Sequence, residues 1–354
     1  MSEQQFGIGV IGKPHLGGTW SASPLGRYVA GCDLDEAACA QAKEDLGIAV
    51  YTDYQEMIAH PEVDVVVVKT PNHVHKAPTI AALEAGKHVF CEKPMALSME
   101  DCREMVETAR RHDRMLQVDL ELRSSGLPVR MKEIVDSGEL GEIRRIMFNH
   151  YQGAWDAPPD HWRMNLETSG GIYPEKLVHE VDLFRWLVGE VTAVQSFTTE
   201  NVLPQSTMPD CLQSMFWFEN GALGSMLHTQ TRSAMNVEPG HFAECGHELW
   251  FDVIGTEGSM CADFWEGCVE VYHFKPGSGP GTRVAHFARF EEFAPLGQHA
   301  LGHNTGAHFA EFLRRIAAGE PEQQPPEDVL RTMAVTFTAE RSVRTGERVT
   351  VESP

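Results

Sequence analysis

The chain has 354 residues, of which 42% are hydrophobic and 23% charged, and its formal net charge is −22. This composition is that of an ordinary globular protein and excludes collagen-like and low-complexity chains. The acidic balance disfavours nucleic acid or anionic lipid as the main partner, because both are bound through an excess of Lys and Arg. The length corresponds to about two domains.

The termini, cysteines and apolar runs of the chain bear on its location. The first residues lack the pattern of a secretory signal. The eight cysteines include no C-x-x-C pair, which favours free thiols over a disulfide or zinc framework. The longest aliphatic run, Val65–Val68, is far too short to span a membrane. We therefore expect a cytoplasmic protein without a membrane partner.

Apolar stretches alternate with helical segments over the first 120 residues. This alternation predicts βαβ units and a parallel, Rossmann-type sheet, which binds its ligands at the carboxyl ends of its strands. The run of four valines at 65–68 is typical of a strand buried on both faces. We expect strands at 6–11, 28–32, 64–70, 87–91 and 115–118, and helices at 35–46, 74–85 and 98–112.

The pattern changes near residue 141, where strands dominate. We expect an α+β domain with a large, mostly antiparallel open sheet over residues 123–354, after a dinucleotide-binding domain over residues 1–122. The C-terminal helix can pack back on the first domain, and residues 276–281 predict an exposed hairpin. The expected strands are 141–150, 190–200, 211–219, 222–230, 248–254, 258–264 and 269–274, and the expected helices are 127–137, 175–188, 304–318 and 326–342.

A glycine-containing loop follows the first strand directly. Gly12 and Gly17 have the spacing of a dinucleotide-binding loop, but the position between them is Pro14, which has no N–H and crowds a pyrophosphate. Asp33 ends the second strand, where a carboxylate binds ribose hydroxyls and repels the 2′-phosphate of NADP. An ordinary strand–loop turn and a helix-capping aspartate are the alternative interpretations.

Two further segments follow the next strands, TPNHVH at 70–75 and CEKP at 91–94. Together with the glycine loop, the segment 170–182 and GTEG at 255–258, they occur in an order that resembles the GFO/IDH/MocA (glucose-fructose oxidoreductase, inositol dehydrogenase, rhizopine catabolism) family over nearly the whole chain. The resemblance implies an enzyme that uses NAD. It places the cofactor contacts at Gly12, Lys13, Pro14, His15, Leu16, Asp33, Thr70, Pro71, Asn72, His75, Glu92 and Lys93.

The resemblance also assigns Lys93 as the catalytic lysine. In a crevice beside a cationic nicotinamide we expect a lowered pKa, so that Lys93 can bind the substrate hydroxyl and help to remove its proton. Pro94 follows, in such enzymes often after a cis bond. From Gly17 to Asp33 the chain is about one helical turn shorter than in most members of the family, so its first helix is shortened. With Pro14, this predicts an altered pyrophosphate cradle and weaker or differently placed NAD binding.

A second catalytic segment lies further along the chain. Glu175, His179 and Asp182 have the spacing of one helix face. His179 is the candidate general acid or base, and Glu175 the carboxylate that orients it or contacts the substrate. The family usually has Asp and Gly at 175 and 177, whereas this chain has Glu175 and Leu177, with Lys176 between them. Two alternative interpretations of these residues are a buried histidine beside a structural ion pair and a metal site formed by Glu175, His179 and Asp182.

The substrate pocket is expected between the domains, because aromatic rings stack on sugar C–H surfaces while His, Asp and Arg bind hydroxyls. A strand edge with an ordered loop, or an ion pair at the domain junction, is the plainer interpretation of the same residues. The substrate candidates are Lys93, Arg123, His150, Tyr151, Trp155, His161, Trp162, Arg163, Glu175 and His179, with Glu121 at the junction.

These observations predict an NAD-dependent dehydrogenase that oxidises a secondary alcohol of a sugar, cyclitol or glycoside. A redox-neutral use of NAD, which cleaves a glycoside or epimerises a carbon, is an alternative, and a non-catalytic NAD- and sugar-binding regulator is another. Lys93 and His179 argue against the regulator. A large open sheet usually covers its outer face by pairing, so a homodimer or homotetramer is expected.

Overall fold

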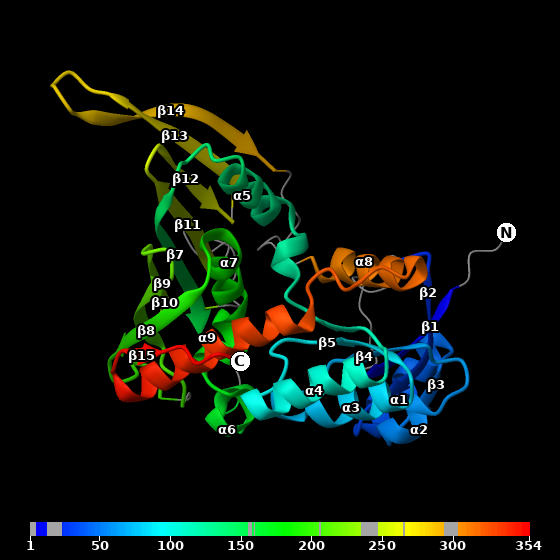
Figure 1. Cartoon of the computed structure of the whole chain (residues 1–354). Helices are drawn as coiled ribbons and strands as arrows, with labels where there is room; N and C mark the ends of the chain where they lie inside the picture. The colour runs from blue at the N-terminus through cyan, green and yellow to red at the C-terminus, as the bar shows by residue number, and fades with distance from the viewer. Residues whose placement is uncertain are drawn as a thin grey trace.

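The polypeptide forms two sheets that lie side by side, one of six strands and one of nine (Figure 1). Both expected sheets are therefore confirmed. None of the helices in the described ranges is long and apolar enough to cross a membrane. The computed structural model describes residues 5–12, 23–154, 158, 160–204, 207–234, 247–264, 266–293 and 304–354.

The six-stranded sheet is wholly parallel, with the order β3-β2-β1-β4-β5-β6. The strand order reverses between β1 and β4, which is where a doubly wound sheet opens its ligand crevice. The four valines of β4 are completely buried. The strands are β1 (Phe6–Ile11), β2 (Gly26–Cys32), β3 (Ala49–Tyr51), β4 (Val65–Val68), β5 (His88–Cys91) and β6 (Leu116–Val118), and the helices are α1 (Glu36–Leu46), α2 (Tyr54–Ile58), η1 (Asn72–Val74), α3 (Lys76–Glu84) and α4 (Met99–Arg111).

Polar caps explain where these helices begin. The Asp35 carboxylate accepts from the N–H groups of Ala37 and Ala38 at the start of α1. The Ser98 hydroxyl accepts from the N–H of Asp101 at the start of α4. Each side chain satisfies a backbone donor that has no partner inside the helix.

The nine-stranded sheet has the order β14-β13-β12-β11-β7-β10-β9-β8-β15. Its only parallel pair among the described strands is β7 with β10, and the other pairs are antiparallel. The strands are β7 (Ile143–Ala154), β8 (Val191–Thr198), β9 (Cys211–Phe218), β10 (Leu223–Ala234), β11 (His247–Gly255), β12 (Gly258–Asp263), β13 (Cys268–Pro276), β14 (Arg283–Glu292) and β15 (Val349–Thr350).

Helices α5, α7 and α9 cover one face of this sheet (Figure 1). Phe148, Phe184, Phe216 and Phe251 pack between the sheet and the helices and are almost completely buried. The remaining helical elements are η2 (Glu121–Ser124), α5 (Gly126–Asp136), η3 (Trp162–Met164), α6 (Leu166–Ser169), η4 (Tyr173–Leu177), α7 (Val178–Val188), α8 (Thr305–Ala318) and α9 (Pro326–Thr345).

Two C-terminal helices also pack on the six-stranded sheet and its helices. Val329 and Met333 of α9 belong to the core that contains α4 and β6. Phe309 and Phe312 of α8 pack against Phe90 of β5, on the opposite face of the sheet from α3 and α4 (Figure 1). The predicted boundary after residue 122 stays a prediction, because residues from both sides of it build each core.

Candidate active site

A cavity of about 350 Å³ lies between the carboxyl-end edge of the six-stranded sheet and the helix-covered face of the nine-stranded sheet. Residues that follow β5 and β6 form one side of it. Side chains of β7, β11 and the η4–α7 segment form the other. The lining residues are Glu92, Lys93, Asp119, Glu121, Leu122, Phe148, His150, Gln152, Arg163, Glu175, Lys176, His179, Glu180, Leu249, Phe251, Phe264 and Thr305.

The described ends of β1, β2 and β4 fit a dinucleotide. Gly12 has φ +90°, and a Cβ atom there would lie 2.5 Å from the carbonyl oxygen of Lys69. Only glycine therefore fits where these two strand ends approach. The buried Thr70 hydroxyl has no hydrogen-bond partner within the described part of the chain. Asp33 directly follows β2 and is half-buried, and its Oδ1 accepts from the N–H of Asp35 at 2.9 Å. A ribose or phosphate oxygen would supply the missing partner for Thr70.

His75 connects the two loops that follow β4 and β5. Its Nδ1 lies 2.7 Å from the carbonyl oxygen of Pro94, and its Nε2 lies 3.0 Å from that of Thr70. The ring is 1% exposed, and burial lowers its pKa although both carbonyl contacts act in the opposite direction. The Lys93–Pro94 peptide bond is cis. His75 therefore fixes the loop that carries Lys93 and does not itself line the cavity.

Glu175 joins the two halves of the site. Its Oε2 accepts from Asn72 Nδ2 at 2.9 Å, and its Oε1 accepts from Arg163 Nε at 2.8 Å. The ammonium group of Lys93 donates to the backbone carbonyl of the same residue. Burial alone would raise the pKa of Glu175, but the Lys93 and Arg163 cations and the two hydrogen bonds lower it below the ordinary value. Each oxygen of this carboxylate accepts one hydrogen bond, and its negative charge attracts the nearby Lys93 ammonium group, which suits Glu175 to position Arg163 and Lys93.

His179 lies one helical turn beyond Glu175, and its ring is 4% exposed. Its Nδ1 is 3.6 Å from Oε2 of Glu121, which is also buried. An adjacent carboxylate stabilises an imidazolium ring and orients it. The pair therefore has the arrangement of a proton acceptor with its orienting group.

Two further carboxyl groups line the same side of the cavity as Glu121. Burial, Asp119 and Glu121 raise the pKa of Glu92 to about 8, although Lys93 and Lys69 oppose the shift. Burial and Glu121 raise the pKa of Asp119, although its hydrogen bond to Nδ1 of His308, 2.9 Å long, acts the other way. The carboxyl groups that follow β5 and β6 therefore release their protons at higher pH than ordinary surface acids do.

Lys176 is the second lysine of the cavity. Its Nζ donates to Oε1 of Gln152, on β7, at 2.8 Å. Burial lowers the pKa of Lys176 well below the ordinary value, and Lys93 and Arg163 add to this effect, whereas Glu175 and Glu180 oppose it.

Of the predicted substrate residues, Arg163 and His150 line the cavity, whereas Trp162 does not. The guanidinium carbon of Arg163 lies 4.5 Å from the centre of the Trp162 indole ring, and the His161 ring stacks on Trp162 with ring centres 5.8 Å apart. His150 lines the cavity, with its Nδ1 3.1 Å from Nδ1 of His228. Tyr151 is the neighbour of His150 on β7 and projects to the opposite face of the sheet, since strand side chains alternate.

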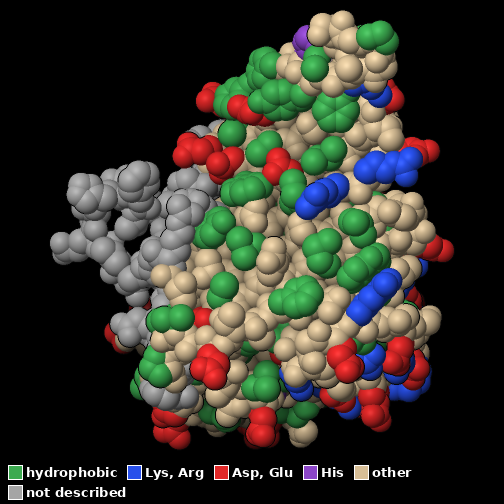
Figure 2. Space-filling model, turned by 90° about the vertical axis from the view of Figure 1, so that its left-hand side faces the viewer, with side chains coloured by type: hydrophobic (Ala, Val, Ile, Leu, Met, Phe, Trp, Pro, Cys, Tyr) green, Lys and Arg blue, Asp and Glu red, His purple; other side chains and the backbone are tan. Residues whose placement is uncertain are grey.

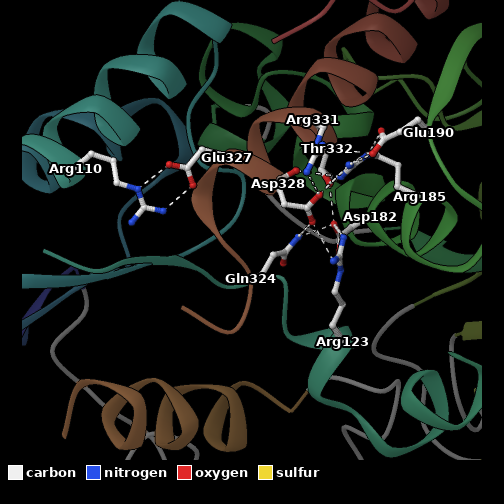
Figure 3. A network of polar contacts seen from close by, with 10 residues as sticks. All are labelled: Arg110, Arg123, Asp182, Arg185, Glu190, Gln324, Glu327, Asp328, Arg331 and Thr332. Atoms are coloured by element: carbon white, nitrogen blue, oxygen red, sulfur yellow. Dashed lines mark hydrogen bonds and ion pairs between the residues drawn. The ribbon is translucent and has the colours of Figure 1, made fainter. Parts of the chain in front are cut away.

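Arg123 belongs to a network of charges that connects η2, α7 and α9 (Figure 3). Its guanidinium donates to both oxygens of Asp182 at 2.6 Å and lies 3.0 Å from Asp328. Thr332 and Gln324 also donate to Asp182. Asp182 thus faces this network, and in the described ranges no group of three or more His, Cys, Asp and Glu side chains is arranged to hold a metal ion.

Some predicted contacts cannot be placed. Lys13, Pro14, His15 and Leu16 of the glycine loop, and Trp155, lie outside the described residues. The expectation of an altered pyrophosphate cradle lies there as well.

Sequence reasoning missed several cavity residues. Gln152 lies two residues after His150 on the same strand face, so strand alternation could have identified it. Asp119 directly follows β6, where the position of ligands at strand ends could have suggested it. Glu180 and Thr305 gave no such signal, because their place in the cavity depends on how the two sheets meet.

Comparison with known proteins agrees with this architecture. Residues 6–120 match the model of an oxidoreductase family with an NAD-binding Rossmann fold, and residues 129–261 match the GFO/IDH/MocA C-terminal domain. Inositol 2-dehydrogenase of Salmonella typhimurium is 30% identical over 258 residues, which are 71% of this chain and 70% of that protein. Myo-inositol 2-dehydrogenase of Thermotoga maritima is 26% identical over 352 residues, covering 98% and 97%.

Solved structures show the same fold. A levoglucosan dehydrogenase in complex with NADH and levoglucosan superposes with a TM-score of 0.79 at 23% identity and covers 98% of this chain and 100% of its own. Both parts of the chain, the parallel sheet with its glycine at the end of β1 and the nine-stranded sheet that closes the cavity, are thus accounted for by one family. The chain belongs to the GFO/IDH/MocA family of oxidoreductases.

Proposed function

We propose that the protein is an NAD-dependent dehydrogenase that oxidises a secondary hydroxyl group of a sugar or cyclitol. The observation that carries this proposal is the convergence of Lys93, Glu175 and His179 on one cavity at the carboxyl end of β5. Family membership supports the same reaction class, since relatives are named inositol dehydrogenases and a levoglucosan dehydrogenase. NAD supplies the hydride acceptor when it is bound.

The side chains of the chain handle the substrate and its proton. Lys93, held by the Glu175 carbonyl, would donate to the substrate hydroxyl oxygen and stabilise the negative charge that develops there. His179 would accept the hydroxyl proton at Nε2, while Glu121 at 3.6 Å from Nδ1 stabilises the resulting imidazolium. Glu175 positions Lys93 and Arg163 and is not the base, because both of its oxygens accept hydrogen bonds.

The experiment is a panel of sugars, inositols and glycosides incubated with NAD, in which NADH absorbance and product mass are followed together. We expect NADH to accumulate with a product two mass units lighter than its substrate. Lys93→Ala and His179→Ala should fold normally and lose turnover by a factor of at least about 10², the contribution of a positioned acid or base. Product formation without NADH would instead support the redox-neutral alternative, and wild-type rates in either variant would refute the role of that residue.

We also propose that the chain forms a homodimer or homotetramer through the nine-stranded sheet, in the reducing cytoplasm. Figure 2 shows hydrophobic side chains spread over the face that the helices leave open. Phe197, Leu223 and Phe287 of this sheet are 52%, 39% and 60% exposed. The seven described cysteines are free thiols, as expected in a reducing compartment. Light scattering tests the assembly, and a monomer at micromolar concentration would contradict it.

A further inference from the structure

The backbone at η4 turns two consecutive side chains into the cavity. Residues Tyr173–Leu177 form a π-helical turn that continues into α7. A π turn contains more residues than an α-helical turn, so neighbouring side chains are separated by a smaller angle, and such turns recur at functional sites. Glu175 and Lys176 therefore both line the cavity, together with His179.

The side chain of Lys176 is held from the opposite wall. Gln152, 3% exposed on the central strand β7, accepts from Nζ of Lys176 at 2.8 Å. A lysine side chain has several rotatable bonds, so holding its end in place removes an ordering cost that would otherwise fall on substrate binding. An ammonium group has three donors, and the hydrogen bond to Gln152 uses one of them.

The electrostatics of this position favour a hydroxyl group as the acceptor. Lys93 and Arg163 are the other cations that act on Lys176, and Glu175 and Glu180 are the carboxylates. Both oxygens of Glu175 already accept hydrogen bonds, from Asn72 and Arg163. A hydroxyl group can accept from an ammonium group and donate to a neutral amine. It therefore matches Lys176 in either protonation state, which a carboxylate does not.

We propose that Lys176 is a specificity-determining residue, which binds one ring hydroxyl of the substrate other than the hydroxyl at which Lys93 and His179 act, with Gln152 as its positioning residue. The inference rests on the proposed function, since it takes the substrate to be a polyhydroxylated ring. In this role Lys176 would discriminate, through KM, among polyols that have the same oxidisable carbon but differ at the second hydroxyl. Removing its amino group should weaken binding of the ground state and transition state alike, which raises KM and leaves kcat nearly unchanged.

The test is a double-perturbation cycle in which KM and kcat are measured for the wild type and for Lys176→Met, each with the best substrate of the panel and with its single-deoxy derivatives. We expect KM to rise about tenfold in the variant, the loss of one hydrogen bond to a charged or polarised group, with kcat within about threefold of wild type. One deoxy derivative should raise the wild-type KM by a similar factor and cause no further rise in the variant. Such non-additivity identifies a direct contact, because independent changes would add.

Further variants keep the result interpretable. Gln152→Leu should raise KM by a smaller factor, and Lys43→Met, on the exposed surface of α1, should change nothing. Lys176→Gln, which keeps a donor, replaces the methionine variant if thermal melting shows that the latter does not fold. Additive effects on KM for every deoxy derivative, or a fall in kcat at constant KM, would overturn the role of Lys176, whereas the proposed dehydrogenase function would stand. No turnover of any polyol by the wild type would overturn the proposed function, and the inference with it.

Discussion

Replacement of Asp182 by alanine should destabilise the fold strongly, although the residue lies outside the cavity. Asp182 is 1% exposed, and its two oxygens accept from Arg123, Thr332 and Gln324 (Figure 3). Its removal leaves the guanidinium of Arg123, whose side chain is only 16% exposed, with Asp328 as its remaining carboxylate in the network. Two neighbouring donors lose an acceptor at the same time.

The size of the effect follows from burial. Breaking one partner of a buried ion pair costs about 3–5 kcal/mol in the free energy of unfolding, because it leaves a buried charge uncompensated. For a chain of 354 residues, the usual unfolding entropy per residue converts this into a fall of roughly 4–7 °C in Tm. The exposed pair Arg341–Glu352, with side chains 53% and 80% exposed, is the matched control, and Glu352→Ala should change stability by less than about 1 kcal/mol.

Thermal melting followed by circular dichroism measures both variants. The double variant Arg123→Met with Asp182→Leu should recover much of the loss, since replacing a buried pair by apolar groups of similar volume is often neutral. An Asp182→Ala protein that melts within about 1 °C of the Glu352→Ala control would refute the reasoning, as would a double variant less stable than the single one.

Three other predictions concern a glycine before α7 and two carboxyl groups of the cavity. Gly171→Ala should lower Tm by several degrees, because φ is +108° and the new Cβ would lie 2.2 Å from the Glu340 carboxyl group. The control Gly346→Ala, at φ +69° with no atom near the new Cβ, should lower Tm by less. Equal melting temperatures of the two variants would contradict this prediction. The pKa of Glu92 is raised to about 8 mainly by burial, so the folded state keeps a proton that the unfolded state releases above about pH 4.5, and the stability of the fold decreases as the pH rises from 4.5 to 8. Glu92→Gln should therefore flatten the decline of Tm between pH 5 and 8. A decline of Tm as steep as that of the wild type would contradict this prediction. Glu175→Ala should reduce kcat at least about tenfold, because Arg163 loses its hydrogen-bond acceptor and Lys93 loses a neighbouring negative charge, although the backbone carbonyl to which Lys93 donates remains. Steady-state rates within twofold of wild type would exclude this role.

Local signals in the sequence account for most of the predicted fold. The four consecutive valines indicate the buried strand β4, and Asp35 and Ser98 are residue types typical of the position at which a helix begins. The strand β3 and the helix α2 were not predicted, since they have three and five residues and too few buried positions to show a period. The strand β14 was not predicted either, because it lies at the sheet edge with nearly every residue exposed, and only its hairpin connection left a turn signal.

The candidate site could be predicted where it follows strand ends and not where distant segments meet. Lys93 lies directly after a parallel strand, and His179 follows a family motif. The contact of Glu175 with Asn72 spans 103 positions in the chain, and that of His308 with Asp119 spans 189. No periodicity reports such pairings, because they depend on the relative placement of the two sheets.

The position of α8 has a consequence for synthesis on the ribosome. Phe309 and Phe312 cover Val67 and Phe90, yet the end of β5 at Cys91 and the start of this helix at Thr305 are 214 positions apart in the chain. The emerging N-terminal segment can pair its six strands early, but this apolar surface stays uncovered until residues 305–318 have left the exit tunnel. The six-stranded sheet therefore cannot complete its core before α8 emerges, and until then it exposes apolar surface of the kind that makes partly folded chains prone to aggregation.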